Sequence, residues 1–177
     1  MTFSKIVKLP KTISLGIKNV TKQLKTVWIF SSKGRIRKKI FGDIYLKTTL
    51  NLLFIKAKNK TLLNTYLSIL KLVFFGILKD YFLFLEMRGT GFKFEIYNNL
   101  LVLRLGFSHL VKKKIFAGIQ LVVLKPNLIL LKSFDLQVLT KFCAVIKRCK
   151  PLDSYKGKGI CFKGTVKLLK EGKKTQQ

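Results

Sequence analysis

Lysines and glycines alternate in the stretch SYKGKGICFKG, which spans residues 154–164. A chain uses glycine where the backbone needs a positive φ angle or where another backbone comes close. If the stretch is a strand, the spacing of two residues puts Lys156 and Lys158 on one face, with Lys163 further along. Lysine side chains and exposed main-chain N–H groups both bind phosphate. The stretch therefore predicts a surface that a nucleic-acid backbone approaches closely.

Two aromatic residues, Tyr155 and Phe162, accompany these lysines. Each has two interpretations: the ring stacks on an unpaired RNA base, or it packs toward the interior of the protein. Both interpretations stay open at the level of the sequence.

A second basic stretch, FSHLVKKK, spans residues 107–114. The side chains of Ser108 and His109 can form hydrogen bonds with phosphate or ribose, and the run from Lys112 to Lys114 supplies positive charge. His109 fits a structural role at the end of a strand equally well. This stretch is a second candidate surface for RNA.

The charge balance of the whole chain narrows the class of partner. The 177 residues include 36 Lys and Arg against seven Asp and Glu, which gives a formal net charge of +29. Such an excess repels itself unless a polyanion neutralises it. Hydrophobic residues make up 49% of the chain, enough for a core, which excludes a disordered basic tail. A folded core covered with cations is typical of a nucleic-acid binder, and an acidic membrane is the other surface that would attract it.

Residues that carry catalytic or metal chemistry are scattered. The seven carboxylates show no spacing suited to acid–base work; they are Asp43, Asp80, Glu86, Glu95, Asp135, Asp153 and Glu171. Cys143, Cys149 and Cys161 lack the close pairs of a zinc site and are interpreted as reduced thiols. We expect Cys143 in the core and Cys149 and Cys161 partly accessible. The segment RGTGFKF lacks the Gly-Lys-Ser/Thr ending of a phosphate loop. We therefore expect no enzyme, not even a metal-dependent RNA-processing nuclease, and no cofactor, metal or small-molecule substrate.

The first half of the chain is expected to form strands and then a helix. The runs KTVWIF and RIRKKIF flank the turn-rich SSKG and predict a hairpin, and DIYL and NLLFIKA are two further strands. Thr61 is expected to cap a helix that ends near Lys79, with Asp80 at its exit. Nearly every face of this helix is apolar, so it should be buried between a sheet and another part of the structure.

The second half repeats this pattern. FKFEI and LLVLRLG are joined by a tight turn at Asn98 and Asn99, and IQLVVLK and LILLK form another hairpin. Asp135 then precedes a helix, which Pro151 ends. Four residues share one stripe of that helix: Leu139, Phe142, Cys143 and Ile146.

The most membrane-like segment runs from Leu62 to Leu85, but Lys71 and other polar residues interrupt it. A charge near the middle of a membrane span is costly. A cationic membrane-surface protein anchored by residues 62–85 is the alternative function. The opening residues lack both the apolar core of a signal peptide and the arginines of a transit peptide, so we expect no leader.

Several blocks, in order, resemble the family of the sixth large-subunit ribosomal protein, of bacterial and organellar type. SYKGKGI with the later KEGKK resembles its C-terminal signature, LRLGFSH a second block, and SFDLQV with FCAVIKRCKP its last helix. KLPKTISLGIK and KGRIRKKI are similar to its opening strands, so the resemblance covers essentially the whole chain. The chain departs from the pattern at three places: the loop before Tyr155 is one residue longer, Cys161 and Phe162 replace a common arginine and tyrosine, and Leu110 replaces a proline.

The resemblance implies an α+β fold of two similar small domains, each an antiparallel β-sheet packed with an α-helix. We place them at residues 1–82 and 83–177, the second being the rRNA-binding domain with a basic C-terminal tail. The residues expected to bind RNA are Arg88, Ser108, His109, Lys112, Lys113, Lys114, Tyr155, Lys156, Gly157, Lys158, Gly159, Lys163, Lys170, Lys173 and Lys174.

The resemblance also implies the partners. They are large-subunit rRNA near the factor-binding stalk base and the sarcin–ricin loop, and neighbouring large-subunit ribosomal proteins, with translation factors nearby and no homo-oligomer. The lysine-rich, AT-driven composition, the departures from the family pattern and the absence of a leader favour a mitochondrial ribosome over a plastid or bacterial one.

Overall fold

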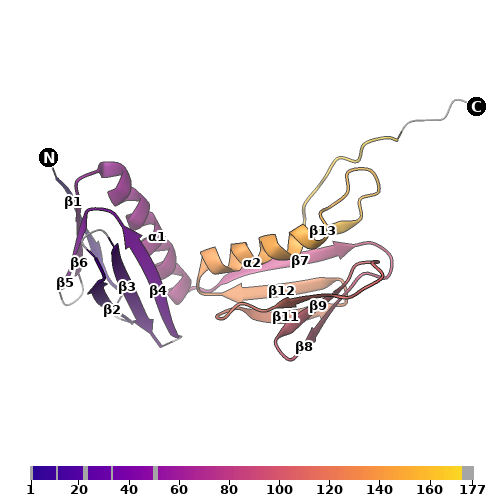
Figure 1. The fold of residues 1–177 in the computed structure, drawn as a ribbon, viewed down its shortest axis with the longest axis horizontal. Coiled ribbons are helices and arrows are strands. Elements are labelled where there is room, and N and C mark those ends of the chain that lie inside the picture. Colours follow the sequence, from indigo (N-terminus) through magenta and orange to yellow (C-terminus); the bar gives the residue numbers. More distant parts are fainter. Residues whose placement is uncertain (1, 11, 22–23, 33, 50–51, 173–177) are drawn as a thin grey trace, which may run out of the picture. The chain divides into compact units, whose positions relative to one another are not determined.

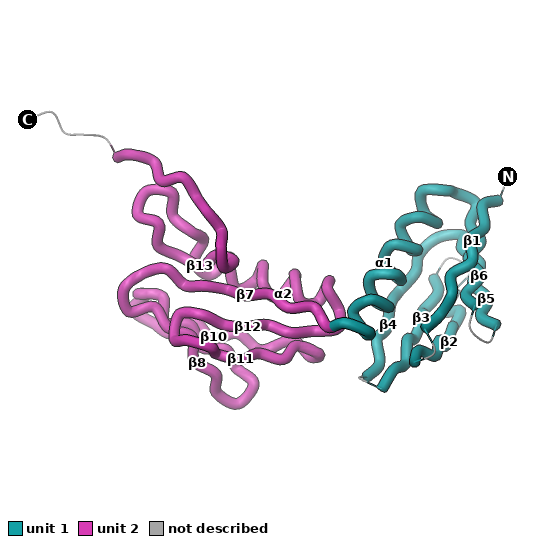
Figure 2. Tube along the Cα trace, turned by 180° about the vertical axis from the view of Figure 1, so that it is seen from behind, with its two compact units in different colours: residues 1–79 teal, residues 80–177 magenta. Residues whose placement is uncertain are grey.

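The computed structural model describes residues 2–10, 12–21, 24–32, 34–49 and 52–172. The chain divides into two compact units, Met1–Lys79 and Asp80–Gln177 (Figure 2). This division falls shortly before the boundary at 82/83 expected from the sequence. The reason is that strand β7 (Tyr81–Arg88) is one continuous element of the second unit.

The described residues of unit 1 form two three-stranded antiparallel sheets and one helix (Figure 1). The first sheet has the order β1-β6-β5 and consists of β1 (Phe3–Lys8), β5 (Ile44–Thr49) and β6 (Leu52–Ala57). The second has the order β2-β3-β4 and consists of β2 (Ile13–Asn19), β3 (Leu24–Ser31) and β4 (Gly34–Phe41). The hairpin predicted around SSKG is confirmed as the antiparallel pair β3 and β4.

Helix α1 (Lys60–Leu78) follows β6 and packs against β6 and β1. Its N-cap is Asn59, so the expected cap at Thr61 is wrong: the helix begins earlier, and the Thr61 carbonyl already accepts a bond from the Thr65 hydroxyl at 2.9 Å. Among the described residues, α1 is the one helix with the length and apolar composition to cross a membrane. It ends at Leu78, however, and a strand begins at Tyr81, so the apolar segment 62–85 is not a single helix.

Unit 2 also pairs antiparallel sheets with one helix. The four-stranded sheet has the order β11-β12-β7-β13 and contains β7, β11 (Gln120–Lys125), β12 (Leu128–Ser133) and β13 (Gly159–Phe162). The three-stranded sheet has the order β10-β9-β8 and contains β8 (Lys93–Tyr97), β9 (Leu100–Arg104) and β10 (Val111–Lys114). The predicted α+β class, with antiparallel sheets and two helices, is thus confirmed.

Helix α2 (Leu136–Cys149) lies against β12, β7 and β13. Asp135 is its N-cap, and the carboxylate accepts a hydrogen bond from Gln137 N at 3.0 Å. The predicted stripe is fully buried in the unit 2 core: Leu139, Phe142, Cys143 and Ile146. The predicted turn at Asn98 and Asn99 is also confirmed, since both residues have positive φ angles, 41° and 63°.

Candidate nucleic-acid interface

The basic motif near the C-terminus begins as a loop, not as a strand. The chain leaves α2 at Lys150, and β13 starts only at Gly159. The expectation that Lys156 and Lys158 share a strand face is therefore wrong, because Gly157 between them has a positive φ of 66° that turns the backbone. Both lysines are nevertheless exposed, and so is Tyr155, with 59% of its surface accessible. The tyrosine thus lies on the surface, which removes the inward-packing interpretation.

Asp153 organises this loop through main-chain hydrogen bonds. Its carboxylate accepts from Tyr155 N at 3.1 Å and from Lys156 N at 3.0 Å. Its own N–H donates to the Lys158 carbonyl at 2.9 Å. These donors, the Tyr155 N–H first, lower the pKa of the Asp153 carboxyl below its ordinary value. Asp153 carries the one carboxylate of the loop, and this carboxylate is hydrogen-bonded to main-chain N–H groups of the same loop.

The backbone of Gly159 is closely approached by another part of the protein's own chain, Pro151 and Leu152. Its φ is 142°, and a Cβ atom there would stand 2.5 Å from the Pro151 carbonyl oxygen and 2.7 Å from Leu152 Cα. Pro151 forms a parallel bridge with Ile160, which brings the start of the loop against β13. Gly159 is buried, so the fold requires this glycine, a role different from the expected contact with RNA.

The segment after β13 runs back along the loop. The Thr165 carbonyl accepts a hydrogen bond from Arg88 Nη2 at 3.0 Å. Further on, Lys170 N donates to the Ser154 carbonyl at 2.9 Å. Arg88 and Lys170 are therefore brought to the same side of unit 2 as the loop. Lys163 lies at the other end of β13, with its ammonium 5.5 Å from the Phe84 ring.

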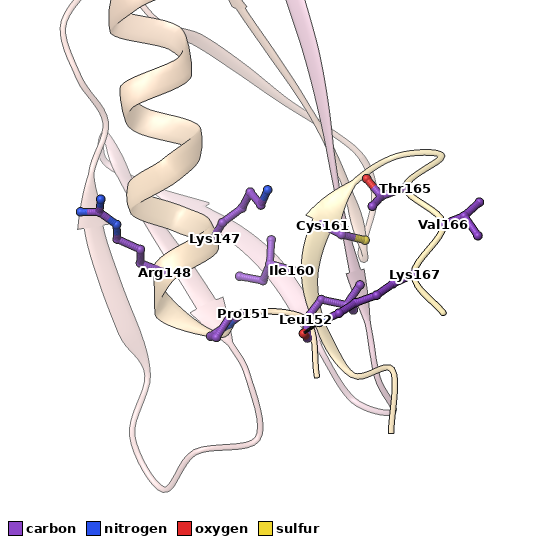
Figure 3. Close-up of a pocket in the computed structure, with 9 residues that line it drawn as sticks. All are labelled: Lys147, Arg148, Pro151, Leu152, Ile160, Cys161, Thr165, Val166 and Lys167. Atoms are coloured by element: carbon purple, nitrogen blue, oxygen red, sulfur yellow. Dashed lines mark hydrogen bonds between the residues drawn. The ribbon is translucent and has the colours of Figure 1, made fainter. Parts of the chain in front are cut away.

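A pocket of about 390 Å³ opens between the last turn of α2, β13 and the returning segment (Figure 3). Its walls combine apolar and cationic side chains: Lys147, Arg148, Pro151, Leu152, Ile160, Cys161, Thr165, Val166 and Lys167. Lys147 also covers Phe162, with Nζ 4.3 Å from the ring centroid. Sequence reasoning missed the cations of this pocket as site residues. The signal was present in the run KRCK, because a basic last turn of α2 is followed at once by the loop.

The turn that carries Ser108 and His109 packs against the C-terminal end of α2. Lys150 Nζ donates to the Leu105 carbonyl at 3.1 Å and lies 4.3 Å from the Phe107 ring. Phe107 stacks on His109, with ring centroids 5.9 Å apart. Ser108 and His109 are both exposed. Lys150, which the sequence did not single out, thus joins the second basic stretch to the start of the loop.

The lysine run on β10 points elsewhere. Lys112 and Lys114 are exposed and Lys113 is half-buried, as alternation along a strand requires. Lys114 pairs with Leu100, at the end of β9 opposite to the His109 turn. Lys112 lines a groove of about 320 Å³ together with Arg104 and Glu95, which form an ion pair with Nε and Oε1 3.1 Å apart. This groove is formed mainly by residues of β8, β9 and β10, whereas the loop precedes β13 of the other sheet. Lys173 and Lys174 lie outside the described residues.

The three cysteines are free thiols. Burial raises the pKa of the Cys143 thiol to about 11, and Cys161 is only 2% exposed, so the expectation of partial access at Cys161 is wrong. Cys161 pairs with Glu86 across β13 and β7, on the face opposite to the core residues Ile160 and Met87, and it lines the pocket beside Thr165 and Val166. Within the described ranges, no three His, Cys, Asp or Glu side chains gather in a group that could hold a metal ion.

Comparisons with known proteins show the family of the chain. The family described as Ribosomal protein L6 matches residues 88–163, which include the loop and the His109 turn. The Large ribosomal subunit protein uL6m of Marchantia polymorpha is 41% identical over 96 residues, covering 53% of this chain and 95% of that protein. The Large ribosomal subunit protein uL6m of Reclinomonas americana is 28% identical over 184 aligned residues, covering 97% of each. The chain therefore belongs to the ribosomal protein L6 family, whose members are non-enzymatic structural proteins of the large ribosomal subunit.

Proposed function

We propose that the loop of residues 150–158 and the segment of residues 163–172 bind the backbone of large-subunit rRNA. One observation carries this proposal: the Asp153 carboxylate accepts from Tyr155 N and Lys156 N, and the Asp153 N–H donates to the Lys158 carbonyl. These bonds hold all three residues on the outside of a turn. A loop that is ordered before binding loses little conformational freedom when RNA arrives. The interface is thus built to position RNA and performs no chemistry.

In this interface the lysines contact phosphates and the aromatic ring contacts a base. Lys156 and Lys158 attract phosphates from the tip of the loop, and Lys170 adds charge from the adjacent segment. The exposed ring of Tyr155 offers a surface on which an unpaired base stacks. Lys147, Arg148 and Lys167 extend the basic surface around the neighbouring pocket.

Membership in the family supports a particular place for this interface. We assign it to rRNA near the factor-binding stalk base and the sarcin–ricin loop, beside neighbouring large-subunit proteins and close to translation factors. Both relatives named above are mitochondrial homologues, and the chain is as lysine-rich as expected for an AT-rich organellar genome. We therefore assign the protein to the mitochondrial ribosome.

Sedimentation and crosslinking test this function. Large subunits are separated on a sucrose gradient, and mass spectrometry follows the protein, which we expect to co-sediment with them. Ultraviolet crosslinking of the same fractions should join Tyr155 or its neighbours to nucleotides of the stalk base or the sarcin–ricin region. A protein that stays in membrane fractions without ribosomes, and leaves them only in high salt, would contradict the proposal.

A further inference from the structure

The sheet β2-β3-β4 of unit 1 has one side whose residues are exposed or half-buried, apart from the buried Thr26. Strand alternation puts Val27, Ile29, Ile36 and Ile40 on the inner side, and all four are buried. The register then aligns three rows across the other side: Ser14, Phe30 and Arg35; Gly16, Trp28 and Arg37; and Lys18, Thr26 and Lys39. We call these nine residues the Trp28 face.

Two aromatic rings occupy the centre of the Trp28 face. Phe30 is 43% exposed, and Trp28, two residues earlier on β3, is half-buried. The Phe30 ring lies over Gly16, since a Cβ atom at that glycine would stand 3.3 Å from Phe30 Cε2. The rings thus stand on adjacent rows, about 7 Å apart along the strand. At this spacing, each ring can stack on a different base.

Cations surround these rings. Lys18, Arg35, Arg37 and Lys39 are all exposed, and the Arg37 guanidinium lies 5.6 Å from the Trp28 ring. Asp43 is the sole carboxylate side chain in the sequence of residues 1–79, and it pairs with Lys58 at 3.2 Å, outside the Trp28 face. The face therefore carries four positive charges and no acidic side chain.

We infer that the Trp28 face binds unpaired RNA nucleotides, with bases stacked on Trp28 and Phe30 and phosphates held by the surrounding cations. Exposed rings alone would suit an apolar partner, and cations alone would suit any polyanion. Their interleaving on one sheet matches the pairing of stacking platforms and basic grooves that single-stranded nucleic acid requires. Double-stranded RNA keeps its bases stacked inside the helix and cannot use the rings. This surface belongs to unit 1, whereas the loop of residues 150–158 belongs to unit 2.

Trp28 is the single tryptophan of the chain, so its fluorescence reports on this face alone. The full-length protein is titrated with decauridylate, with an RNA duplex of equal length and with a polyphosphate of matched charge. We expect decauridylate to quench the fluorescence to saturation, while duplex and polyphosphate bind the basic protein without comparable quenching. Equal quenching by polyphosphate would overturn the inference, because electrostatic contact alone would then explain the signal.

Charge-neutral variants test the stacking separately, by fluorescence anisotropy of labelled decauridylate. Trp28→Leu and Phe30→Leu keep an apolar side chain, and each should weaken binding by about tenfold. The control is Tyr45→Leu on β5, which belongs to the other sheet of unit 1. The Tyr45 side chain is 58% exposed, and Lys25 Nζ lies 5.5 Å from its ring centroid, so this variant also removes an exposed ring next to a cation. It should leave the affinity unchanged, and circular dichroism verifies that all variants fold.

Two further results decide between RNA and other partners. Lys156→Ala with Lys158→Ala should lower the total affinity for rRNA but leave the quenching of Trp28 intact, so failure of the unit 2 interface and failure of this inference are distinguishable. Poly-glutamate stands for an acidic protein partner. If Trp28→Leu weakened the binding of poly-glutamate and not of decauridylate, the face would be a protein-docking surface and the inference would be wrong.

Discussion

The carbonyl oxygen of Pro151 lies 2.5 Å from the point where a Cβ atom would stand on Gly159. The backbones of Pro151 and Gly159 therefore pack closely at the base of the loop of residues 150–158. At the same place, Ile160 N donates a hydrogen bond to the Lys150 carbonyl at 2.9 Å. The exposed lysines of the basic motif are thus positioned by a glycine that is itself buried.

Gly159→Ala should destabilise the protein, because the methyl group meets backbone atoms that cannot rotate away and the φ of 142° strains any other residue. We expect the free energy of unfolding to fall by about 2 kcal/mol or more. Urea denaturation measures the loss. The control is Gly164→Ala, where φ is also positive, at 80°, but no atom lies within 4 Å of the added methyl group. It should cost only about 1 kcal/mol; equal losses in the two variants would show that the Pro151 contact is unimportant.

Lys156→Ala combined with Lys158→Ala should weaken binding to rRNA and leave the fold intact, because both side chains are exposed. Each lost phosphate contact releases about one counterion fewer, so the salt slope should drop by about one unit per lysine. Binding measured over a series of salt concentrations gives both quantities. The matched control removes two exposed lysines of α1, by Lys60→Ala with Lys71→Ala, and should change the affinity far less. An unchanged slope in the loop variant would disprove the role of the two lysines.

Asp153→Ala should also weaken RNA binding, although it removes a negative charge from a site for a polyanion. The reason is that the carboxylate holds Tyr155 N and Lys156 N and so orders the tip of the loop. Filter binding compares this variant with Asp153→Asn, which keeps one acceptor oxygen and should retain part of the affinity. Tighter binding by the alanine variant would mean that local charge outweighs loop order.

Acidification should loosen the same loop in the intact protein. The folded-state pKa of Asp153 is lowered, so its contribution to stability is complete above the ordinary carboxyl pKa of 3.8 and is lost as the pH falls through the still lower folded value. NMR signals of the Tyr155 and Lys156 amides, followed from neutral to acidic pH, measure this change. A loop whose amide signals keep their positions down to the pH at which the whole protein unfolds would contradict it.

Thiol labelling should separate the three cysteines. Cys143 is fully buried with its pKa raised to about 11, and Cys161 is 2% exposed, whereas Cys149 is half-buried. At mildly alkaline pH a thiol reagent should therefore modify Cys149 first, and the other two only after unfolding. We also expect no disulfide and no stoichiometric zinc. Rapid labelling of Cys161 in the native protein, or a mobility shift on reduction, would contradict these expectations.

Local patterns in the sequence predicted both helices and most of the strands, but not β1, β7 and β10. The helical stripe from Leu139 to Ile146 is buried as predicted, because periodicity alone decides which side of a helix can enter a core. The turn at Asn98 and Asn99 also follows from local chemistry, since asparagine tolerates positive φ. The family resemblance follows from short ordered motifs, and the basic character of the surface follows from the composition.

Contacts between distant residues were decided only by the tertiary structure. Lys156 and Lys158 are exposed as expected, yet the turn at Gly157 and the bonds to Asp153, rather than strand alternation, make them so. Arg88 reaches Thr165, 77 residues away, because β13 pairs with β7. The alternation of β3 and β4 was readable in the sequence, but the alignment of Trp28 with Arg37 and Gly16 was not. Strand register depends on pairing across the sheet, which no single segment encodes.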